Sequence, residues 1–294
     1  MIEFNKFYKH FNILSLILVI ISLSFLIIKG LNFGIDFKGG TLIELRSNDN
    51  KINVSSLRDN LNQMDLGDVS VKSFGNETDF LIKFEINDNK NVIEQIKLNL
   101  DKSFGNNFDF RRVENVGPKV SAELLRSGII AITISLILML IYIWIRFEWQ
   151  FSCGAILALF HDVIVTLGLF SFLSLEINLS IIAAVLTIVG YSMNDTVVIY
   201  DRVRENLRKY SDIKIFELTN ISINETLSRT LITSITTLLA LLSIFFFGGE
   251  ILKGFSLAMI FGVIFGTYSS IYIANTVLVR LNVSQKTILK EEEN

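Results

Sequence analysis

Long apolar stretches recur along this chain and alternate with polar segments. A helix needs roughly 20 apolar residues to cross a hydrocarbon core about 30 Å thick. Six stretches meet this requirement and predict six membrane-spanning helices, over residues 11–29, 128–146, 151–173, 178–200, 229–247 and 255–279. The first follows Lys6 and Lys9, as the apolar part of a signal peptide would, but no small-residue cleavage site follows Ile28. We therefore expect this stretch to be retained as an anchor.

The segment at residues 31–127 is too polar to cross a membrane and is long enough for a small domain. Its apolar positions alternate where strands are expected and recur every three or four residues where helices are expected. The predicted elements are a strand at 42–45 leaving a Gly39-Gly40 hairpin turn, a helix at 54–64, strands at 69–71 and 80–86, a helix at 92–100 and a strand at 108–110. This β-α-β-β-α-β order is that of a ferredoxin-like domain.

This segment shows no pattern of a metal site, a nucleophile pair or a phosphate loop, which favours a binding or mechanical role over catalysis. Its aromatic residues are expected in the domain core: Phe74, Phe80, Phe84, Phe104, Phe108 and Phe110. The predicted fold class is a membrane α-helical protein with six transmembrane helices and one small α+β ferredoxin-like domain. The chain is expected to divide into four parts. Residues 1–30 hold the amino end and the first span, 31–127 form the outer domain, 128–279 hold spans two to six, and 280–294 are a tail.

Composition agrees with a membrane protein. The 294 residues are 51% hydrophobic and 19% charged, with a mean hydropathy of +0.50, whereas soluble domains are about a quarter charged. A net charge of −2 gives no electrostatic basis for binding nucleic acid. The single cysteine, Cys153, lies in an apolar stretch, so no intrachain disulfide can form and a buried structural thiol is expected. Without a nucleotide-binding loop, neither ATP nor another cofactor or metal is expected.

Lysine and arginine in short loops indicate the cytoplasmic side of a membrane protein. They gather at the amino end, in a predicted loop at 201–229, and in the tail: Lys6, Lys9, Arg202, Arg204, Arg208, Lys209, Lys214, Arg229, Arg280, Lys286 and Lys290. The opposite side holds Glu176, Glu250 and Lys253. Both termini are therefore expected in the cytoplasm and residues 31–127 on the outer side of the membrane. An aromatic belt is expected at the turn between spans two and three, at Tyr142, Trp144 and Trp149.

Ionisable side chains inside the predicted spans are the main functional candidates, because such groups are costly in a bilayer and usually face protein or water. They are His161 and Asp162 in span three, Asp195 beside Asn194 and Thr196 in span four, and Arg229 at the start of span five. Burial favours the protonated form of a carboxyl group, and a nearby cation favours the ionised form. Asp195 beside a movable Arg229 could therefore carry protons.

Span five adds hydroxyl groups on the face of its arginine, since Arg229, Thr233, Thr236 and Ala240 follow one another at spacings of 4, 3 and 4 residues. That face could hold water or support a proton path. Structural alternatives remain open at each position. Asp195 could cap a helix or pair with Arg229, His161 could be a packing residue, and Arg229 could be a positive-inside anchor. A solvated helix end is expected at Asp201, Arg202, Arg204 and Glu205.

Small residues form stripes on two predicted spans and indicate close helix packing. In span six they recur every four residues, at Ala258, Gly262, Gly266, Ser270 and Ala274, and in span four they are Ala183, Thr187, Gly190 and Asn194. The stripes do not show whether the neighbouring helix belongs to this chain or to another.

Three segments resemble motifs of the SecD/SecF family. GIDFKGGT at residues 34–41, with Asp36, Gly39 and Gly40, resembles its signature at the start of the outer domain. VGPKVSAEL at 116–124, with Gly117 and Pro118, resembles its element before span two, although Ser121 replaces the usual glycine. YSMNDTVVIYDRVREN at 191–206 is similar to the SecF form of its fourth-span motif. The last motif and the chain length point to the SecF side of the family.

The resemblance implies a member of the resistance-nodulation-division superfamily, in which twelve spans form two halves. SecD would supply the other six spans, and the pair would assist the SecYEG channel in the bacterial inner membrane, using the proton motive force to promote translocation of preproteins. The resemblance implies proton conduction by Asp195 and Arg229, with a less defined part for His161 and Asp162. No enzymatic activity is implied.

Three other functions were weighed. A small-molecule or lipid exporter of the same superfamily usually carries both halves in one chain, which this chain does not. An intramembrane aspartyl protease would need Asp162 and Asp195 to share a proton, yet His161, Asn194 and Arg229 adjoin them. A non-conducting membrane scaffold would tolerate neutralisation of Asp195, whereas a proton-driven device would not.

Overall fold

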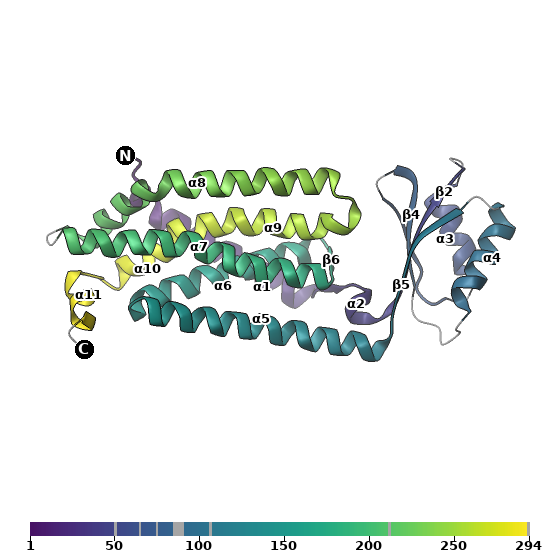
Figure 1. The fold of residues 1–294 in the computed structure, drawn as a ribbon, viewed down its shortest axis with the longest axis horizontal. Helices are drawn as coiled ribbons and strands as arrows, with labels where there is room; N and C mark the ends of the chain where they lie inside the picture. Colours follow the sequence, from purple (N-terminus) through teal and green to yellow (C-terminus); the bar gives the residue numbers. More distant parts are fainter. Residues whose placement is uncertain are drawn as a thin grey trace. The chain divides into compact units, whose positions relative to one another are not determined.

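The computed structural model describes residues 1–49, 52–64, 66–74, 76–84, 91–105, 108–210 and 213–292 (Figure 1). The chain divides into two compact units, residues 1–32 with 130–294 and residues 33–129. The first unit is helical, and the second combines a four-stranded sheet with helices. Both chain termini lie at the same end of the helical unit (Figure 1).

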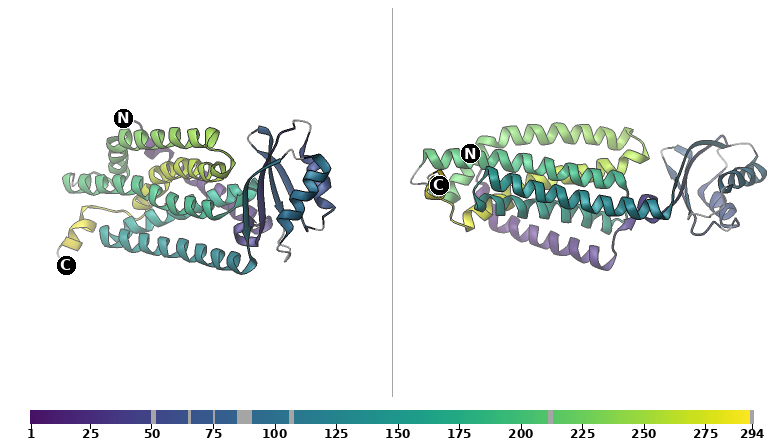
Figure 2. Two further views of the ribbon diagram at one scale, coloured as in Figure 1. Left: turned by 45° about the vertical axis from the view of Figure 1, so that its right-hand side comes forward. Right: turned by 60° about the horizontal axis from the view of Figure 1, so that its bottom comes forward.

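The helical unit holds six helices that are long and apolar enough to cross a membrane, counted over the described residues. The first runs through η1 (Phe4–Phe7) and α1 (Tyr8–Ile28), followed by α5 (Pro118–Arg146), α6 (Trp149–Phe172), α7 (Leu179–Lys209) and α8 (Ile215–Phe247). The sixth runs through α9 (Glu250–Ser269), a π-helical turn η2 (Ser270–Ala274) and α10 (Asn275–Arg280). The helices lie side by side in both views of Figure 2. The prediction of six membrane-spanning helices is confirmed.

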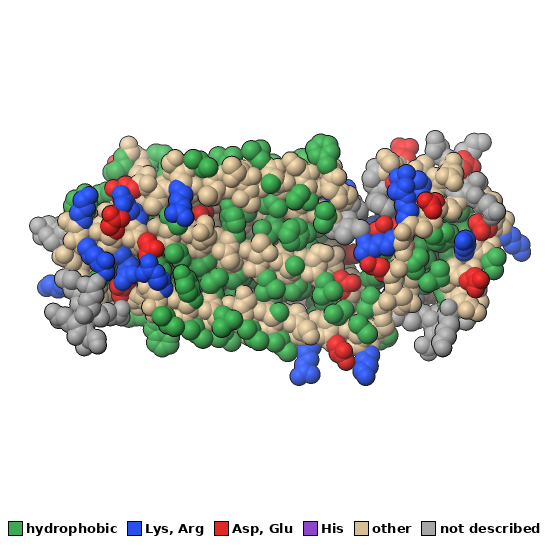
Figure 3. Space-filling model, in the orientation of Figure 1, with side chains coloured by type: hydrophobic (Ala, Val, Ile, Leu, Met, Phe, Trp, Pro, Cys, Tyr) green, Lys and Arg blue, Asp and Glu red, His purple; other side chains and the backbone are tan. Residues whose placement is uncertain are grey.

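The remaining elements of this unit are short. They are β6 (Glu176–Ile177), between α6 and α7, and α11 (Gln285–Glu292) near the carboxyl end. In Figure 3 the flank of the helical unit is mostly hydrophobic, whereas Lys and Arg side chains gather near the end where both termini lie.

The prediction of a loop at residues 201–229 was wrong. Helix α7 continues to Lys209 and α8 already begins at Ile215, so most of this charged segment is helical. The two extensions hold each other by polar contacts: Glu225 accepts hydrogen bonds of 2.7 Å from both Arg202 Nε and Asn206 Nδ2. Hydropathy marks where a helix leaves the apolar layer, but the helix continues wherever its backbone hydrogen bonds and side-chain partners persist.

Small residues allow α9 to approach α7 closely. A Cβ atom added at Gly262 would lie 2.3 Å from Ile188 Cγ1, and one added at Gly266 would lie 3.0 Å from Ser192 Cβ. The stripe on span six therefore packs inside this chain, against α7. Cys153 is exposed on α6, so the expectation of a buried thiol was wrong, because its face of the helix points away from the core of the unit.

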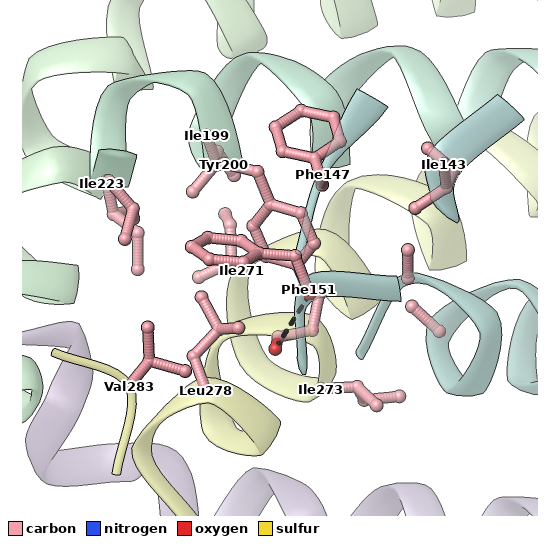
Figure 4. Packing of buried hydrophobic residues seen from close by; sticks show 14 of the residues in the cluster. Ile143, Phe147, Phe151, Ile199, Tyr200, Ile223, Ile271, Ile273, Leu278 and Val283 are labelled. Carbon is pink, nitrogen blue, oxygen red and sulfur yellow. Dashed lines mark hydrogen bonds between the residues drawn. The ribbon is translucent and has the colours of Figure 1, made fainter. Parts of the chain in front are cut away.

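A buried cluster of aromatic and aliphatic side chains joins α6, α7 and α10 (Figure 4). Tyr200 is completely buried, and its hydroxyl donates a hydrogen bond of 3.0 Å to the carbonyl of Ala274. The ring of Phe151 meets that of Tyr200 edge to face, with 5.0 Å between centroids. Gly154 leaves room for this contact, since an added Cβ atom would lie 2.2 Å from the Tyr200 hydroxyl.

The second unit has the predicted β-α-β-β-α-β order. Its elements are β2 (Gly40–Ser47), α3 (Val54–Asn62), β3 (Ser70–Phe74), β4 (Asn76–Phe84), α4 (Val92–Phe104) and β5 (Phe108–Val116). The strands pair antiparallel in the order β3-β4-β2-β5. Each helix therefore connects a central strand to an edge strand, as in a ferredoxin-like domain. The fold-class prediction is therefore confirmed.

The core of this domain comes from the apolar positions that the sequence pattern indicates. Ile43, Phe80, Ile82 and Ile96 are fully buried between the sheet and its helices. Phe84 is also buried, while Phe104, Phe108 and Phe110 pack partly buried against this core. Ile86, expected to extend β4, and the side chain of Phe74 lie outside the described residues.

The Gly39-Gly40 pair does not form the predicted hairpin. Two short elements, β1 (Asn32–Phe33) and α2 (Ile35–Lys38), precede it, and the pair joins α2 to β2. Gly39 ends α2 with a φ of 82°, a left-handed conformation that glycine adopts without strain. A Cβ atom at Gly40 would lie 2.8 Å from the carbonyl oxygen of Phe84. The glycines therefore serve a helix end and a close strand approach.

Candidate functional site

Asp162, on α6, lies at the centre of a buried hydrogen-bond network. Its side chain is completely buried. Its Oδ2 accepts hydrogen bonds from Ser192 Oγ of α7 at 2.6 Å and from Ser269 Oγ of α9 at 2.7 Å. Its Oδ1 lies 2.9 Å from His161 Nδ1. A buried polar group is costly unless it is hydrogen-bonded, so this network holds three helices around one carboxyl group.

His161 is buried beside Asp162 and keeps one nitrogen without a hydrogen bond. Its Nδ1 faces Asp162, while its Nε2 has no partner among the described residues. The imidazole ring lies 5.9 Å from the ring centroid of Tyr268 and 6.2 Å from that of Phe265. The second nitrogen is therefore available to a water molecule or to a proton.

Asp195, on α7, lies in separate polar surroundings formed by α8 and α9. It is 2% exposed, and its Oδ2 accepts a hydrogen bond of 3.3 Å from Thr267 Oγ1. Ser234 of α8 lies 2.7 Å from the same Thr267 hydroxyl, which extends the polar chain to a third helix. The guanidinium of Arg229 is close enough to act on this carboxyl group electrostatically.

Arg229 makes no side-chain hydrogen bond or ion pair with any residue that the structure describes, and it is exposed. The predicted hydroxyl row on its helix face is present, but Thr233 and Thr236 donate to the carbonyls of Arg229 and Ile232 in their own helix. The hydroxyls that serve Asp195 lie elsewhere on α8 and α9. The arginine is thus near the acid without being bound to it.

The two residues that flank Asp195 point in different directions. Thr196 is buried, and its hydroxyl lies 2.7 Å from Ser270 Oγ in the π-helical turn. Asn194 is exposed within this chain. A π-helical turn often occurs at functional sites, and here it lies next to the hydroxyl groups of α9 that contact α6 and α7.

The hydroxyl residues of α9 were missed from the sequence. Thr267 contacts Asp195 and Ser269 contacts Asp162, yet only Ser270 drew notice, as a small packing residue. A cluster of four consecutive hydroxyl side chains in an apolar span, at residues 267–270, was the available signal. Within a helix such groups usually bond to their own backbone, so the sequence alone did not show that they reach two acids.

Asp162 and Asp195 have different hydrogen-bond partners, which are Ser192 and Ser269 for Asp162 and Thr267 for Asp195. This arrangement does not match a pair of acids sharing one proton. Over the described ranges, no group of three or more His, Cys, Asp or Glu side chains could hold a metal ion.

The motif residues outside the spans shape the connection between α2 and α5. Asp36 lies in the first turn of α2, and Pro118 begins α5 directly after Gly117. The hydroxyl of Ser121 donates to the carbonyl of Gly117 at 3.2 Å and to that of Ile35 at 3.4 Å. Ser121, which departs from the family pattern, therefore stabilises the connection between α2 and α5 by these hydrogen bonds.

Comparison with known families and proteins identifies relatives over most of the chain. The family described as Protein export membrane protein SecD/SecF, C-terminal, matches residues 96–284, and the SecD/SecF GG Motif matches residues 24–50. Protein translocase subunit SecF of Rickettsia akari (strain Hartford) is 49% identical over 267 residues, which cover 90% of this chain and 86% of the relative. Protein translocase subunit SecF of Rickettsia rickettsii (strain Sheila Smith) is 48% identical over 94% of this chain and 90% of the relative.

Two solved structures are also similar. The crystal structure of SecDF, a translocon-associated membrane protein from Thermus thermophilus, matches with a TM-score of 0.84 and 36% identity over 95% of this chain. SecDF in a super-membrane-facing form matches with a TM-score of 0.71 and 36% identity over 99% of it. The chain spans 38% and 40% of those two SecDF chains.

Proposed function

The chain belongs to the SecD/SecF family of protein export membrane proteins, on its SecF side, and from this membership we propose that it uses the proton motive force to promote preprotein translocation. In this proposal the chain is one half of a proton-driven unit in the bacterial inner membrane. Both termini lie in the cytoplasm, and the domain at residues 31–127 lies in the periplasm. The spans follow at 128–279, and the tail is 280–294.

The environment of the Asp195 carboxyl group is the observation that carries this proposal. The carboxyl group is buried, accepts a hydrogen bond from Thr267, and lies in the electrostatic field of Arg229. An acid in such a place can hold a proton while the guanidinium is away and release it when the guanidinium approaches. A change of protonation would then change how α7, α8 and α9 pack, which couples proton passage to movement.

Asp162 and His161 are proposed to support the same path. The carboxyl group of Asp162 contacts α7 and α9 through Ser192 and Ser269, so its network shares two helices with Asp195. The free Nε2 of His161 gives a second position at which a proton could be held. Asp36, Gly39, Gly40, Gly117 and Pro118 are proposed to join the domain to the membrane spans, and Asn194 and Thr196 to position the acid.

SecD is the proposed partner for the missing half of a twelve-span unit, because this chain corresponds to about two fifths of each SecDF chain. One face of α7 supports this pairing. Ala183, Thr187, Gly190 and Asn194 are all exposed within the chain, although small residues normally line a helix contact. The SecYEG channel and the translocating preprotein are the further proposed partners.

The function can be tested in inverted membrane vesicles that contain the channel, this chain and SecD. Completion of preprotein translocation is followed after ATP is exhausted, with and without a proton gradient, for the wild type and Asp195→Asn. We expect the gradient to help the wild type only, since asparagine cannot change its charge.

The matched control is Asp201→Asn, which removes an exposed carboxylate from the same helix, where Asp201 pairs with Arg146 at 2.9 Å. This variant should respond to the gradient as the wild type does, and both variants should still co-purify with SecD. An equal response of Asp195→Asn and wild type would leave this chain a scaffold for a partner that does the coupling.

A further inference from the structure

A cavity opens where the amino end of α1 meets the start of α8 and the end of α10. It has a volume of about 520 Å³, and its lining includes Lys6, Lys9 and Arg280. No Asp or Glu lines it, and all its lining residues belong to the described part of the chain. The lining of the cavity therefore carries three cations and no carboxylate.

Two of these cations have no protein partner. Lys6 forms an exposed ion pair with Glu3 at 2.5 Å. The side chains of Lys9 and Arg280 make no ion pair or hydrogen bond with any described residue, and both are exposed. They are the groups of this cavity that remain open to an anion.

The neutral polar groups of the cavity are already satisfied inside the protein. Asn12 Nδ2 donates to Thr276 Oγ1 at 2.8 Å and to the carbonyl of Tyr8 at 2.6 Å. The hydroxyl of Tyr8 donates to Thr219 Oγ1 at 3.1 Å. A ligand would therefore be recognised by charge at the rim and by apolar contact along the wall, since these amide and hydroxyl groups are engaged.

The order of side chains along α1 indicates the shape of that ligand. Lys9, Ile13 and Leu16 follow at spacings of four and three residues, which puts them on one helix face. The side chain of Ile13 is 50% exposed and that of Leu16 is 60% exposed. From Lys9 to Leu16 the helix rises about 10 Å. The face thus changes from cationic to apolar over the distance that separates a lipid headgroup from its acyl chains.

We propose that this cavity binds an anionic phospholipid. Its phosphate would lie between Lys9 and Arg280, and one acyl chain would run along Ile13 and Leu16. Basic pockets between membrane helices bind such headgroups, and Lys and Arg near an anionic surface favour its binding. The proposal goes beyond the export function, and it ties the amino end of α1 to α10 through a shared ligand.

The purified full-length chain in detergent micelles provides the test, with bound lipid measured by native mass spectrometry. The probes are dioleoyl phosphatidylglycerol, dioleoyl phosphatidylcholine with the same acyl chains, and glycerol-1-phosphate without them. We expect phosphatidylglycerol to bind about tenfold more tightly than phosphatidylcholine. Glycerol-1-phosphate should compete weakly, because it lacks the apolar contact.

Two pairs of substitutions separate charge from shape. Lys9→Gln with Arg280→Gln should abolish the preference for phosphatidylglycerol. The matched control, Lys209→Gln with Lys286→Gln, removes the same charge outside the cavity and should keep the preference. Ile13→Ala with Leu16→Ala leaves the charge unchanged and should weaken the binding of both phospholipids. All variants should elute as the wild type does in size-exclusion chromatography.

Three results would overturn the proposal. Equal binding of the two phospholipids would show that the cations do not select the headgroup. If glycerol-1-phosphate displaced phosphatidylglycerol when both are at the same concentration, the cavity would be a site for a free phosphate group. Loss of bound phosphatidylglycerol when SecD is added would show that the cavity is a protein interface.

Discussion

Asp162 and Asp195 are both buried carboxyl groups, but they differ in how many groups surround them. Asp162 has three side-chain partners, whereas Asp195 accepts a hydrogen bond from Thr267 and lies in the electrostatic field of the exposed Arg229. A change in the protonation of Asp162 disturbs three contacts at once, with His161, Ser192 and Ser269. We therefore expect Asp195 to be the group that changes during each cycle and Asp162 to keep the helices in register.

Outside the membrane, an ion pair in the second unit makes a pH-dependent contribution to stability. Arg46 Nε and Nη2 donate to Asp79 at 2.5 and 2.7 Å, and these hydrogen bonds hold the pKa of Asp79 below its usual value. A carboxyl group with a lowered pKa stabilises the folded state above its ordinary pKa of about 3.9. That contribution is lost as the pH falls through the lowered value.

We predict that Asp79→Asn weakens the sheet at pH 6 and has little effect at the lowest pH at which the chain stays folded. Hydrogen–deuterium exchange of β2 and β4 in the full-length chain measures this, with variant and wild type compared at the same pH so that intrinsic exchange rates cancel. Asp109→Asn, at a more exposed carboxylate of β5, is the control. A difference that did not shrink below about pH 4 would contradict the assignment.

At the scale of helices, two glycines that look alike in sequence meet different surroundings. Gly262 of α9 faces Ile188 of α7 inside the chain, whereas nothing lies within 4 Å of a Cβ atom added at Gly190. One glycine is needed for a contact within the chain. Gly190 leaves an exposed surface on α7. The family relationship indicates that another chain covers this surface.

We predict that Gly262→Ala destabilises the helical unit by about 1–3 kcal/mol, because the new methyl group overlaps Ile188 in a packed interface. Thermal unfolding of the purified chain measures the change. Gly190→Ala serves as the control and should leave the midpoint unchanged or slightly raised, since alanine favours helix. Equal midpoints for Gly262→Ala and wild type would show that α7 and α9 pack less closely.

At the scale of the whole chain, the spans differ in how much of their surface the chain covers. The most apolar windows of α1, α5 and α8 are 11%, 11% and 17% buried, whereas those of α6, α7 and the α9–α10 span are 61%, 50% and 56% buried. The last three form the centre of the unit and carry both acids. The first three leave apolar surface that lipid or SecD must cover.

We predict that Gly190→Leu leaves the chain folded and reduces its co-purification with SecD several-fold, because a large side chain would stand on the exposed face of α7. The measurement is the yield of SecD recovered with an affinity-tagged chain. Ser24→Leu, on the exposed side of α1, is the control and should recover SecD as the wild type does. Undiminished recovery with Gly190→Leu would place the SecD contact on another face.

The elements of this protein follow from local patterns. Six spans are marked by runs of apolar residues, and the domain order is marked by periods of two and of three to four residues. The ionisable candidates were also visible, since His161, Asp162 and Asp195 stand out in apolar surroundings. These features depend only on residues near one another along the chain, which is why they could be predicted.

Contacts between distant segments depended on the tertiary structure. It brought Thr267 to Asp195 and Ser269 to Asp162, kept the hydroxyls of Thr233 and Thr236 on their own helix, and used Gly39 as a helix end. A hydroxyl in an apolar helix usually bonds to its own backbone but can also reach a neighbouring helix. Which of these it does depends on the face that packing turns toward the other helices, and that choice is made only when the helices assemble.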